Sequence, residues 1–416
     1  MVFSKNSKSP SPLFGPLDDP DHPFLRLLQH EQYDADIQIS GQFLQSYKGS
    51  QATFNAYRRE VERLLQWLFF IKKTDLKSIT RQHIEAFIEF CRQPPLEWIG
   101  LKNVPRYKLQ GGVPQQHEDW RPFVVRAPKS STNKLTPKDY VLSQSAQESI
   151  LRILSSYFTF LEQEMYIEQN PVKRIRQKSQ FIRKTQGQSA IRRLSELQWS
   201  YVIDTATEMA DKEPHHERTL FIMSALYGMY LRISELSASP RWTPRMNHFF
   251  MDQDGHWWFK TVGKGNKERD ISVSKTMQAA LLRYRCSMGM TNMPTPADQS
   301  ALLPKNKGLG AISSTRHIRR IVQECFDESI HKMNADGFGD EAEQLKAATV
   351  HWLRHTGISD DVKIRPREHV RDDAGHTNSS ITDKYIDIDR RERHASAANK
   401  QLRGYQDEPA STDVSE

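Results

Sequence analysis

The chain has 416 residues, enough for two or three domains, and its 59 lysines and arginines against 51 aspartates and glutamates give a formal charge of +8. This excess suits a polyanionic partner, either nucleic acid or an anionic membrane surface. No apolar run approaches the ~20 residues that span a bilayer, and the N-terminal stretch lacks the apolar core of a signal peptide. Cys91, Cys286 and Cys325 lie far apart, which predicts reduced, buried thiols in a cytoplasmic protein.

The N-terminal half alternates irregular and helical patterns. Residues 1–45 are rich in proline, serine and aspartate and predict a largely irregular arm with one short helix near residues 24–30. Apolar residues at three- and four-residue spacing then predict a helix capped by Thr53 and a second one that starts after Thr80 and stops at Pro94. Ser145 and Glu148 have the spacing of a capping box for a further helix. Residues 46–172 therefore read as a helical bundle.

An insert, residues 94–140, interrupts this bundle. It holds scattered prolines and the pair Gly111-Gly112, and Trp98 and Trp120 indicate that it packs against its neighbours. A basic linker follows over residues 173–193. We expect it to be either a solvated connection or a strand-like segment that crosses a phosphate backbone. Its cations are Lys173, Arg174, Arg176, Lys178, Arg183 and Lys184.

The second half predicts helices on either side of a small antiparallel sheet. A capping box at Ser195 and Gln198 opens a helix over residues 199–211, and an apolar run covers residues 220–230. Strand-like runs at 248–251, 256–262 and 269–273 surround a tight basic turn at 263–267. Helices return from Lys275 and around residues 315–332, and the charged, then acidic, end predicts a short helix and a disordered tail. The fold class is mainly α with a small antiparallel sheet.

Single candidate residues in this half are ambiguous. His351 and Arg354 share one helix face, and His351 with His355 has the spacing of a helical zinc site. A zinc protease needs a glutamate after the first histidine, where Trp352 stands. Taken alone, Arg232 reads as a surface residue or an ion-pair partner of Glu235.

The combination is more informative. L-R-I-S-E-L, the G-K-G-N-K-E-R turn, H-x-x-R-H-T, G-H and a tyrosine nine residues later occur in this order. This set resembles the tyrosine recombinase (phage integrase) family over about residues 195–392, and the N-terminal helices more loosely resemble its core-binding domain. The resemblance implies an arm (1–45), a core-binding domain (46–172), the linker (173–193), a mixed α+β catalytic domain (194–392) and a tail (393–416).

The resemblance implies a role for each motif residue. Arg232 and Arg354 are expected to grip the non-bridging oxygens of the scissile phosphate, because two guanidiniums match the charge of its transition state. Lys264 is expected to protonate the leaving 5′ oxygen, with Lys267 as its rival. His351 and His376 are expected to flank the phosphate as proton-transfer and hydrogen-bonding groups.

Tyr385 is the expected nucleophile, and Tyr405 in the polar tail is the fallback. The phenol of a tyrosine has a pKa of about 10. To act as a nucleophile at neutral pH, the Tyr385 phenol therefore needs cationic neighbours and a base that accepts its proton. No metal or other cofactor is expected, since the arginines supply the electrostatic stabilisation and the covalent 3′-phosphotyrosyl link conserves the bond energy. Three features depart from the family pattern. They are the carboxylates Asp372 and Asp373 before Gly375-His376, the polar run Gly357-Ile358-Ser359-Asp360-Asp361, and a longer separation of Arg232 from Lys264 than in compact members, which predicts an extra loop at Arg241–Asn247.

The predicted function is site-specific recombination, integrating or excising a mobile element. The predicted partners are double-stranded DNA, three further copies in a homo-tetramer on two DNA sites (a monomer or dimer off DNA) and accessory DNA-bending proteins, with no membrane. The expected location is the cytoplasm of a prokaryote, at the nucleoid. Predicted DNA contacts are Arg58, Lys173, Arg174, Lys178, Arg183, Lys184 and Lys267. The alternatives are a type IB topoisomerase-like or hairpin-resolving enzyme of the same chemistry, and an inactive DNA-binding accessory protein.

Overall fold

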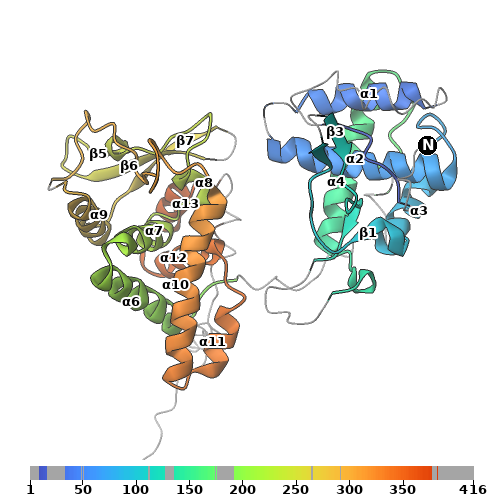
Figure 1. The fold of residues 1–416 in the computed structure, drawn as a ribbon. Coiled ribbons are helices and arrows are strands. Elements are labelled where there is room, and N and C mark those ends of the chain that lie inside the picture. The colour runs from blue at the N-terminus through green and yellow to red at the C-terminus, as the bar shows by residue number, and fades with distance from the viewer. Residues whose placement is uncertain are drawn as a thin grey trace, which may run out of the picture. The chain divides into compact units, whose positions relative to one another are not determined.

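The computed structural model describes residues 9–15, 33–47, 49, 51–110, 113–126, 135–173, 175, 192–263, 266–290, 292–376 and 382. Contacts within the chain divide it into two compact units, Met1–Gln188 and Ser189–Glu416 (Figure 1). Each unit has a hydrophobic core of its own.

The first unit is a helical bundle with two small sheets. Its helices are α1 (Asp34–Gln45), α2 (Gln51–Trp67, continued by a π-helical turn, Leu68–Lys72), α3 (Arg81–Arg92) and α4 (Gln144–Gln163). Its strands are β1 (Ile99–Gly100), β2 (Tyr107–Gln110), β3 (Val113–Gln116) and β4 (Phe123–Val124), and single 3-10 turns cover Leu96–Trp98 and Pro137–Asp139. β1 pairs with β4 in parallel, and β2 with β3 antiparallel.

The apolar stripes of α2 and α3 face the core, as their spacing predicts. Val61, Leu64 and Leu65 are fully buried, and Thr80 caps α3 at the predicted place. The expected cap at Thr53 is wrong, because α2 already begins at Gln51. The expected cap at Ser145 is also wrong: the Ser143 hydroxyl accepts the Ala146 N–H, and α4 begins at Gln144.

Helix α1 lies inside the arm that was expected to be irregular. The Asp36 carboxylate on α1 is buried and accepts hydrogen bonds from the Leu76 N–H (2.9 Å) and the Tyr166 hydroxyl (2.6 Å). These partners are 40 and 130 residues away in the sequence, so tertiary contacts that local propensity does not reveal hold this helix. The helix expected near residues 24–30 lies outside the described residues.

The insert packs against the bundle, as its tryptophans predict. Trp98, Phe123 and Val125 belong to the core of this unit, and Trp120 is 7% exposed. The parallel pairing of β1 with β4 joins the two ends of the segment Ile99–Val124. Residues 94–110 and 113–126 are therefore part of the folded unit.

The second unit places helices around one small sheet (Figure 1). Its helices are α6 (Glu196–Lys212), α7 (Glu217–Gly228), α8 (Ile233–Leu236), α9 (Lys275–Ser287), α10 (Thr315–Ala335), α11 (Gly339–Leu345), α12 (Val350–Ile364) and α13 (Arg367–Ala374). Strands β5 (Phe249–Met251), β6 (Trp257–Val262) and β7 (Glu268–Ser272) form an antiparallel sheet in that order. Single 3-10 turns cover Pro214–His216 and Met246–His248.

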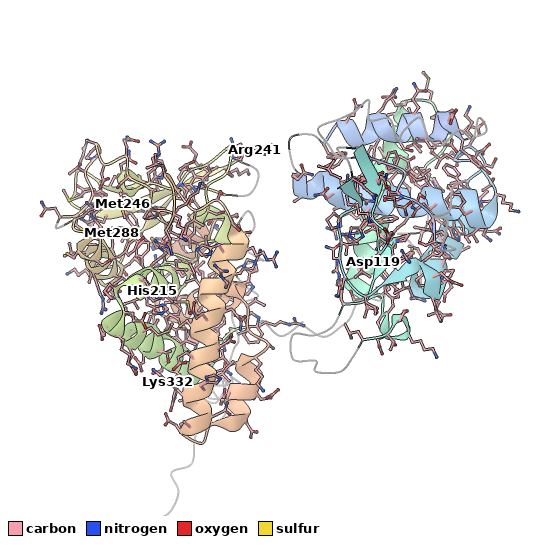
Figure 2. The ribbon with its side chains drawn as sticks, viewed as in Figure 1. Asp119, His215, Arg241, Met246, Met288 and Lys332 are labelled. Atoms are coloured by element: carbon pink, nitrogen blue, oxygen red, sulfur yellow. The ribbon has the colours of Figure 1, made fainter. Side chains whose placement is uncertain are left out.

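The predicted pattern of helices around a meander is confirmed here. Ser195 and Gln198 form the predicted capping box, and β5, β6 and β7 each lie within one residue of the predicted runs. The apolar run of α7 is buried at the centre, with Met246 beside the sheet (Figure 2). Near the far end of α10, Lys332 binds Glu208 of α6 at 2.8 Å (Figure 2).

The cysteines differ from expectation in one case. Cys91 and Cys325 are buried, but Cys286 is exposed near the end of α9. Among the described residues, no helix has both the length and the apolar character needed to cross a bilayer.

Candidate active site

Helix α12 carries three of the motif residues and packs closely on α7. His351, Arg354 and His355 all lie on it, as their spacing predicts. A Cβ at Gly357 would come within 2.1 Å of the Tyr227 carbonyl oxygen, so only glycine permits this approach of the two backbones. The polar run after His355 also binds α7 and the residues after it, because Asp360 accepts the Tyr227 hydroxyl (3.1 Å) and Asp361 accepts the Tyr230 hydroxyl.

Arg354 is the buried centre of the candidate site, with 2% of its surface exposed. Its Nη1 donates to the Tyr230 carbonyl, and its Nη2 donates to the Ala374 carbonyl (2.6 Å) and lies 3.3 Å from His376 Nε2. Tyr230 has a positive φ of 51°, which turns the chain sharply between α7 and α8. One guanidinium thus joins the end of α7, α12 and the end of α13.

Arg232 lies two residues after that turn, at the N-cap of α8. Its backbone N–H donates to Glu235 Oε2 (2.8 Å) and its Nη1 donates to Glu235 Oε1 (3.0 Å). The Arg232 side chain is 25% exposed, whereas that of Glu235 is 1% exposed. The ion pair with Glu235 anticipated from the sequence is therefore present, and it leaves part of the Arg232 guanidinium accessible.

A second arginine, Arg269 on β7, grips the same carboxylate. Its Nη1 and Nη2 donate to the two oxygens of Glu235 at 2.9 Å each, and its Nε donates to the Asp373 carbonyl (3.0 Å). Burial alone would raise the pKa of Glu235, but the hydrogen bonds and charges of Arg269 and Arg232 hold it below its ordinary value. Glu235 therefore stays ionised between two cations and orients Arg232.

His376 follows α13, whose last turn closes on Gly375 with a φ of 62°. The His376 Nδ1 lies 2.9 Å from the Thr382 hydroxyl, and its Nε2 faces Arg354. Burial and the charges of Arg354 and Arg232 lower the pKa of His376 to about 4. The ring is therefore neutral near pH 7.

His351 shares this electrostatic environment. It lies in the first turn of α12 and remains accessible to solvent. Partial loss of water around its ring, together with the charges of Arg354 and Arg232, lowers its pKa. Because both histidines respond to the same two arginines, the structure brings Arg232, His351, Arg354 and His376 together.

Lys264 and Tyr385 lie outside the described residues, but the hairpin that carries Lys264 is placed. A Cβ at Gly263 would lie 2.8 Å from Arg269 Nη1 and 3.6 Å from Arg232 Nη1. The turn that follows β6 thus begins beside Arg232. Lys267, the alternative to Lys264 as proton donor, is exposed. The Lys267 carbonyl oxygen accepts a hydrogen bond from the Gly263 N–H at 2.8 Å.

The two aspartates that depart from the family pattern behave differently. Asp372 is exposed and pairs with Arg371 at 2.8 Å. Asp373 is 5% exposed and accepts the Ser272 N–H (3.1 Å), the Ser272 hydroxyl (2.5 Å) and Arg365 Nη2 (2.6 Å). Asp373 therefore ties α13 to β7 and to the residue after α12.

The predicted DNA contacts are scattered. Arg58, on α2, donates to the Gly15 carbonyl at 2.6 Å and to Asn55 Oδ1 at 2.9 Å. Lys173 pairs with Glu162 at 2.5 Å, and Lys267 is exposed on the hairpin. Arg174, Lys178, Arg183, Lys184 and the fallback nucleophile Tyr405 lie outside the described residues.

Comparisons with known proteins agree with this architecture. Residues 41–98 match the family of phage integrase N-terminal SAM-like domains. The XerH site-specific recombinase bound to a palindromic difH substrate is 13% identical, with 92% of this chain and 93% of that chain covered and a TM-score of 0.52. The Tn1549 transposon integrase in complex with transposon right end DNA is 14% identical, with 87% and 98% covered and a TM-score of 0.52.

The chain has the tyrosine-recombinase fold. No curated protein sequence matches it.

Within this tyrosine-recombinase fold, the sequence predicts no role for several supporting residues. Arg269 ends the G-K-G-N-K-E-R turn and Asp373 is one of the two aspartates that depart from the family pattern, but neither motif indicates that these side chains hold the site together. Arg365, directly after α12, has no motif signal. Together these contacts leave a cationic site in which neutral histidines flank accessible positive charge, an arrangement that can hold an anionic phosphodiester.

Proposed function

We propose that this protein is a site-specific DNA recombinase that cuts and rejoins DNA through a covalent bond between Tyr385 and a 3′ phosphate. The observation that carries the proposal is the meeting of Arg232, His351, Arg354 and His376 in a tyrosine-recombinase fold. The similar XerH structure is a post-cleavage complex with its DNA substrate.

The two arginines are proposed to stabilise the phosphate as it reacts. The transition state gathers negative charge on the equatorial oxygens of phosphorus, and guanidiniums match that geometry. Glu235 holds Arg232 from behind, and backbone carbonyls hold Arg354, so neither needs to reorganise when charge develops.

The remaining residues are proposed to move protons. The Tyr385 oxygen forms a bond to phosphorus while the bond to the 5′ oxygen breaks. His351 accepts the phenol proton, and Lys264 donates a proton to the leaving 5′ oxygen. His376 stays neutral and donates or accepts a hydrogen bond at the phosphate, in keeping with its lowered pKa. Reversal of the same steps with a new 5′ hydroxyl rejoins the strand.

The proposed partner is double-stranded DNA, bound by both units and by the cations of the linker. Full recombination then requires a homo-tetramer on two DNA sites, with accessory DNA-bending proteins where the site demands them. Phosphate contacts would dominate the affinity, so binding should fall steeply as salt rises. The biological role that fits is integration or excision of a mobile element.

The decisive test is a covalent adduct that depends on Tyr385. Tagged protein is purified from host cells under denaturing conditions, and the attached DNA ends are sequenced. We expect adducts with the wild type and the Tyr405→Phe variant, and none with Tyr385→Phe. Adducts that survive Tyr385→Phe would overturn this nucleophile, and their absence from the wild type would favour the accessory-protein alternative.

The recovered site then separates recombination from the related chemistry. A plasmid with two inverted copies of the site should be inverted between them by a recombinase. Relaxation of supercoils without inversion would instead support the type IB topoisomerase-like alternative.

A further inference from the structure

The first unit holds a cluster of arginines that the active site does not use. Six of them line a cavity of about 480 Å³ between α2 and the insert, and we call this cavity the arginine groove. α2 contributes half of its arginines and the insert the other half. They are Arg58, Arg59, Arg63, Arg106, Arg121 and Arg126.

The groove carries a strong excess of positive charge. Its neighbouring carboxylates are Glu62, in its lining, and Glu60, two residues earlier on α2, and both are buried. Glu62 pairs with Arg106, and Glu60 pairs with Arg59 (2.6 Å) and Arg63 (3.0 Å). Six arginines against two carboxylates leave four positive charges uncompensated.

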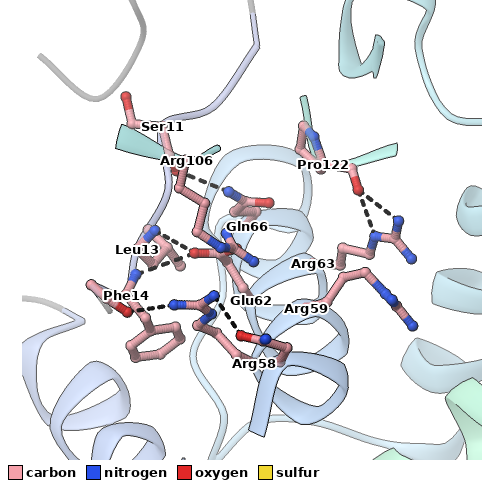
Figure 3. Close-up of polar contacts among 12 residues, drawn as sticks. Ser11, Leu13, Phe14, Arg58, Arg59, Glu62, Arg63, Gln66, Arg106 and Pro122 are labelled. Atoms are coloured by element: carbon pink, nitrogen blue, oxygen red, sulfur yellow. Dashed lines mark hydrogen bonds and ion pairs between the residues drawn. The ribbon is translucent and has the colours of Figure 1, made fainter. Parts of the chain in front are cut away.

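Several of these arginines are held rigidly (Figure 3). Arg63 donates twice to the Pro122 carbonyl (2.8 and 2.6 Å) and stacks over Phe123. Arg106 lies over the Trp120 ring while it binds Glu62. Fixed guanidiniums bind an anion with little loss of side-chain entropy, so these contacts prepare the groove for a ligand.

Other donors in the groove remain available. Arg126 is exposed and makes no hydrogen bond or ion pair with the described residues, and the Arg59 side chain is 41% exposed. The Arg58 Nε is buried without a hydrogen-bond partner in the described structure. Burial and the nearby charge of Arg106 lower the pKa of Arg58 to about 10, so an anion placed here would relieve repulsion among the arginines.

The shape of the groove favours an extended anion over a compact one. A second cavity of about 250 Å³ shares Arg59, Arg63 and Arg126 with the first and continues toward the start of α4. Cations that line two adjoining cavities suit successive phosphates of one strand better than a single small ion.

We propose that the arginine groove binds the phosphate backbone of duplex DNA, and that the insert therefore supplies half of a DNA clamp in the first unit. This inference rests on the proposed function, because it assumes that DNA is the substrate. It assigns a role to the segment that the motifs leave unexplained. Phosphate contacts of this kind position the duplex and carry no base specificity.

The test needs no knowledge of the target sequence. Full-length protein is titrated with two duplexes of unrelated sequence over a range of salt. For the Arg59→Gln/Arg126→Gln variant we expect a slope of log K against log salt that is shallower by roughly 2, and binding weakened about tenfold or more at low salt, equally on both duplexes.

The matched control removes the same charge elsewhere in the unit. Lys77 and Arg81 are exposed and lie outside the groove, so Lys77→Gln/Arg81→Gln should keep the wild-type slope. Arg59→Lys/Arg126→Lys should also keep most of it, because the charge remains. Thermal unfolding of each variant guards against misfolding, and Arg126→Gln alone removes no hydrogen bond or ion pair to the part of the chain that the structure describes.

Two results would overturn the inference while the proposed function stands. In the first, the wild type binds DNA, but the groove variant shows the same affinity and salt dependence as the control variant. The second is a groove that binds inorganic phosphate, seen as a rise in melting temperature lost in the variant, with no change in the DNA slope. A wild type that binds no duplex at all would instead defeat the proposed function.

Discussion

His355 and His376, on helix α12 and after α13, are uncharged in the folded protein near pH 7. Burial, followed by the charges of His351 and Arg354, lowers the pKa of His355 to about 4, as burial and the arginines do for His376. A bound phosphodiester would place negative charge beside these rings and stabilise their protonated forms. The site therefore offers neutral proton acceptors in the absence of DNA.

The lowered pKa of His355 predicts how the free energy of unfolding depends on pH. Its folded pKa lies below its ordinary value of 6.5, so the unfolded chain takes up the proton first as pH falls. The free energy of unfolding is therefore unaffected by His355 above pH 6.5, where the ring is neutral in both states. It decreases as pH falls from 6.5 toward about 4, because only the unfolded chain binds the proton in this range. We expect His355→Gln to unfold in urea with a weaker dependence on pH across this window than the wild type. Parallel curves for the two proteins would contradict the assignment.

Loss of the buried Glu235 carboxylate should cost the protein much of its stability. Its carboxylate is 1% exposed and compensates Arg269 and Arg232. Glu235→Gln would leave buried positive charge unpaired, for which we expect a loss of about 3–5 kcal/mol in the free energy of unfolding. The exposed pair of Glu343 with Lys346 is the control, and Glu343→Gln should cost less than about 1 kcal/mol.

A double variant tests the cause of that loss. The variant Glu235→Gln/Arg269→Met removes the Arg269 charge together with the carboxylate that compensates it, so part of the lost stability should return. Urea unfolding of the single and double variants gives the coupling directly. A double variant that is no more stable than Glu235→Gln would show that charge is not the reason.

Between elements, the position of α13 depends on one buried carboxylate. Asp373 bonds to β7 through Ser272 and to Arg365 after α12, and α13 ends one residue before the Gly375-His376 pair. The neighbouring Asp372 is 67% exposed and pairs with Arg371, so the two adjacent aspartates form a natural comparison.

We expect Asp373→Asn to loosen α13 and Asp372→Asn to leave it intact. The amide replaces an acceptor with a donor facing Ser272 and Arg365, so hydrogen exchange across α13 should accelerate by about tenfold or more, which corresponds to the net loss of at least one charge-assisted bond. Exchange is followed by mass spectrometry at fixed pH. Equal protection of α13 in the two variants would rule out this anchoring role.

Across the whole molecule, the two units are separate folding bodies by their contacts. One core includes Val61, Tyr157 and Phe158, and the other includes Phe221, Phe259 and Leu353. We expect the fragments 1–188 and 189–416 each to give a cooperative thermal transition by calorimetry. A fragment without a transition would mean that its core depends on the other unit.

Much of the element pattern could be predicted because it is local. Apolar spacing marks α2 and α3, the capping box at Ser195 and Gln198 marks the start of α6, and the glycine-rich turn marks the hairpin of β6 and β7. The helix caps at Thr80 and Ser195 were predictable for the same reason. Helix α1 was not, because its buried Asp36 bonds to residues far along the chain.

The sequence by itself determined which residue types are present and which of them share a helix or a turn, because helical and strand periods depend on neighbours in the chain. His351 and Arg354 on one helix follow from that spacing alone. Only the tertiary structure decided that Arg269 shares Glu235 with Arg232, that Asp373 anchors α13, and that the insert faces α2 across six arginines. These pairings join positions 34 to 101 residues apart or depend on burial, and both arise from the packing of the whole core.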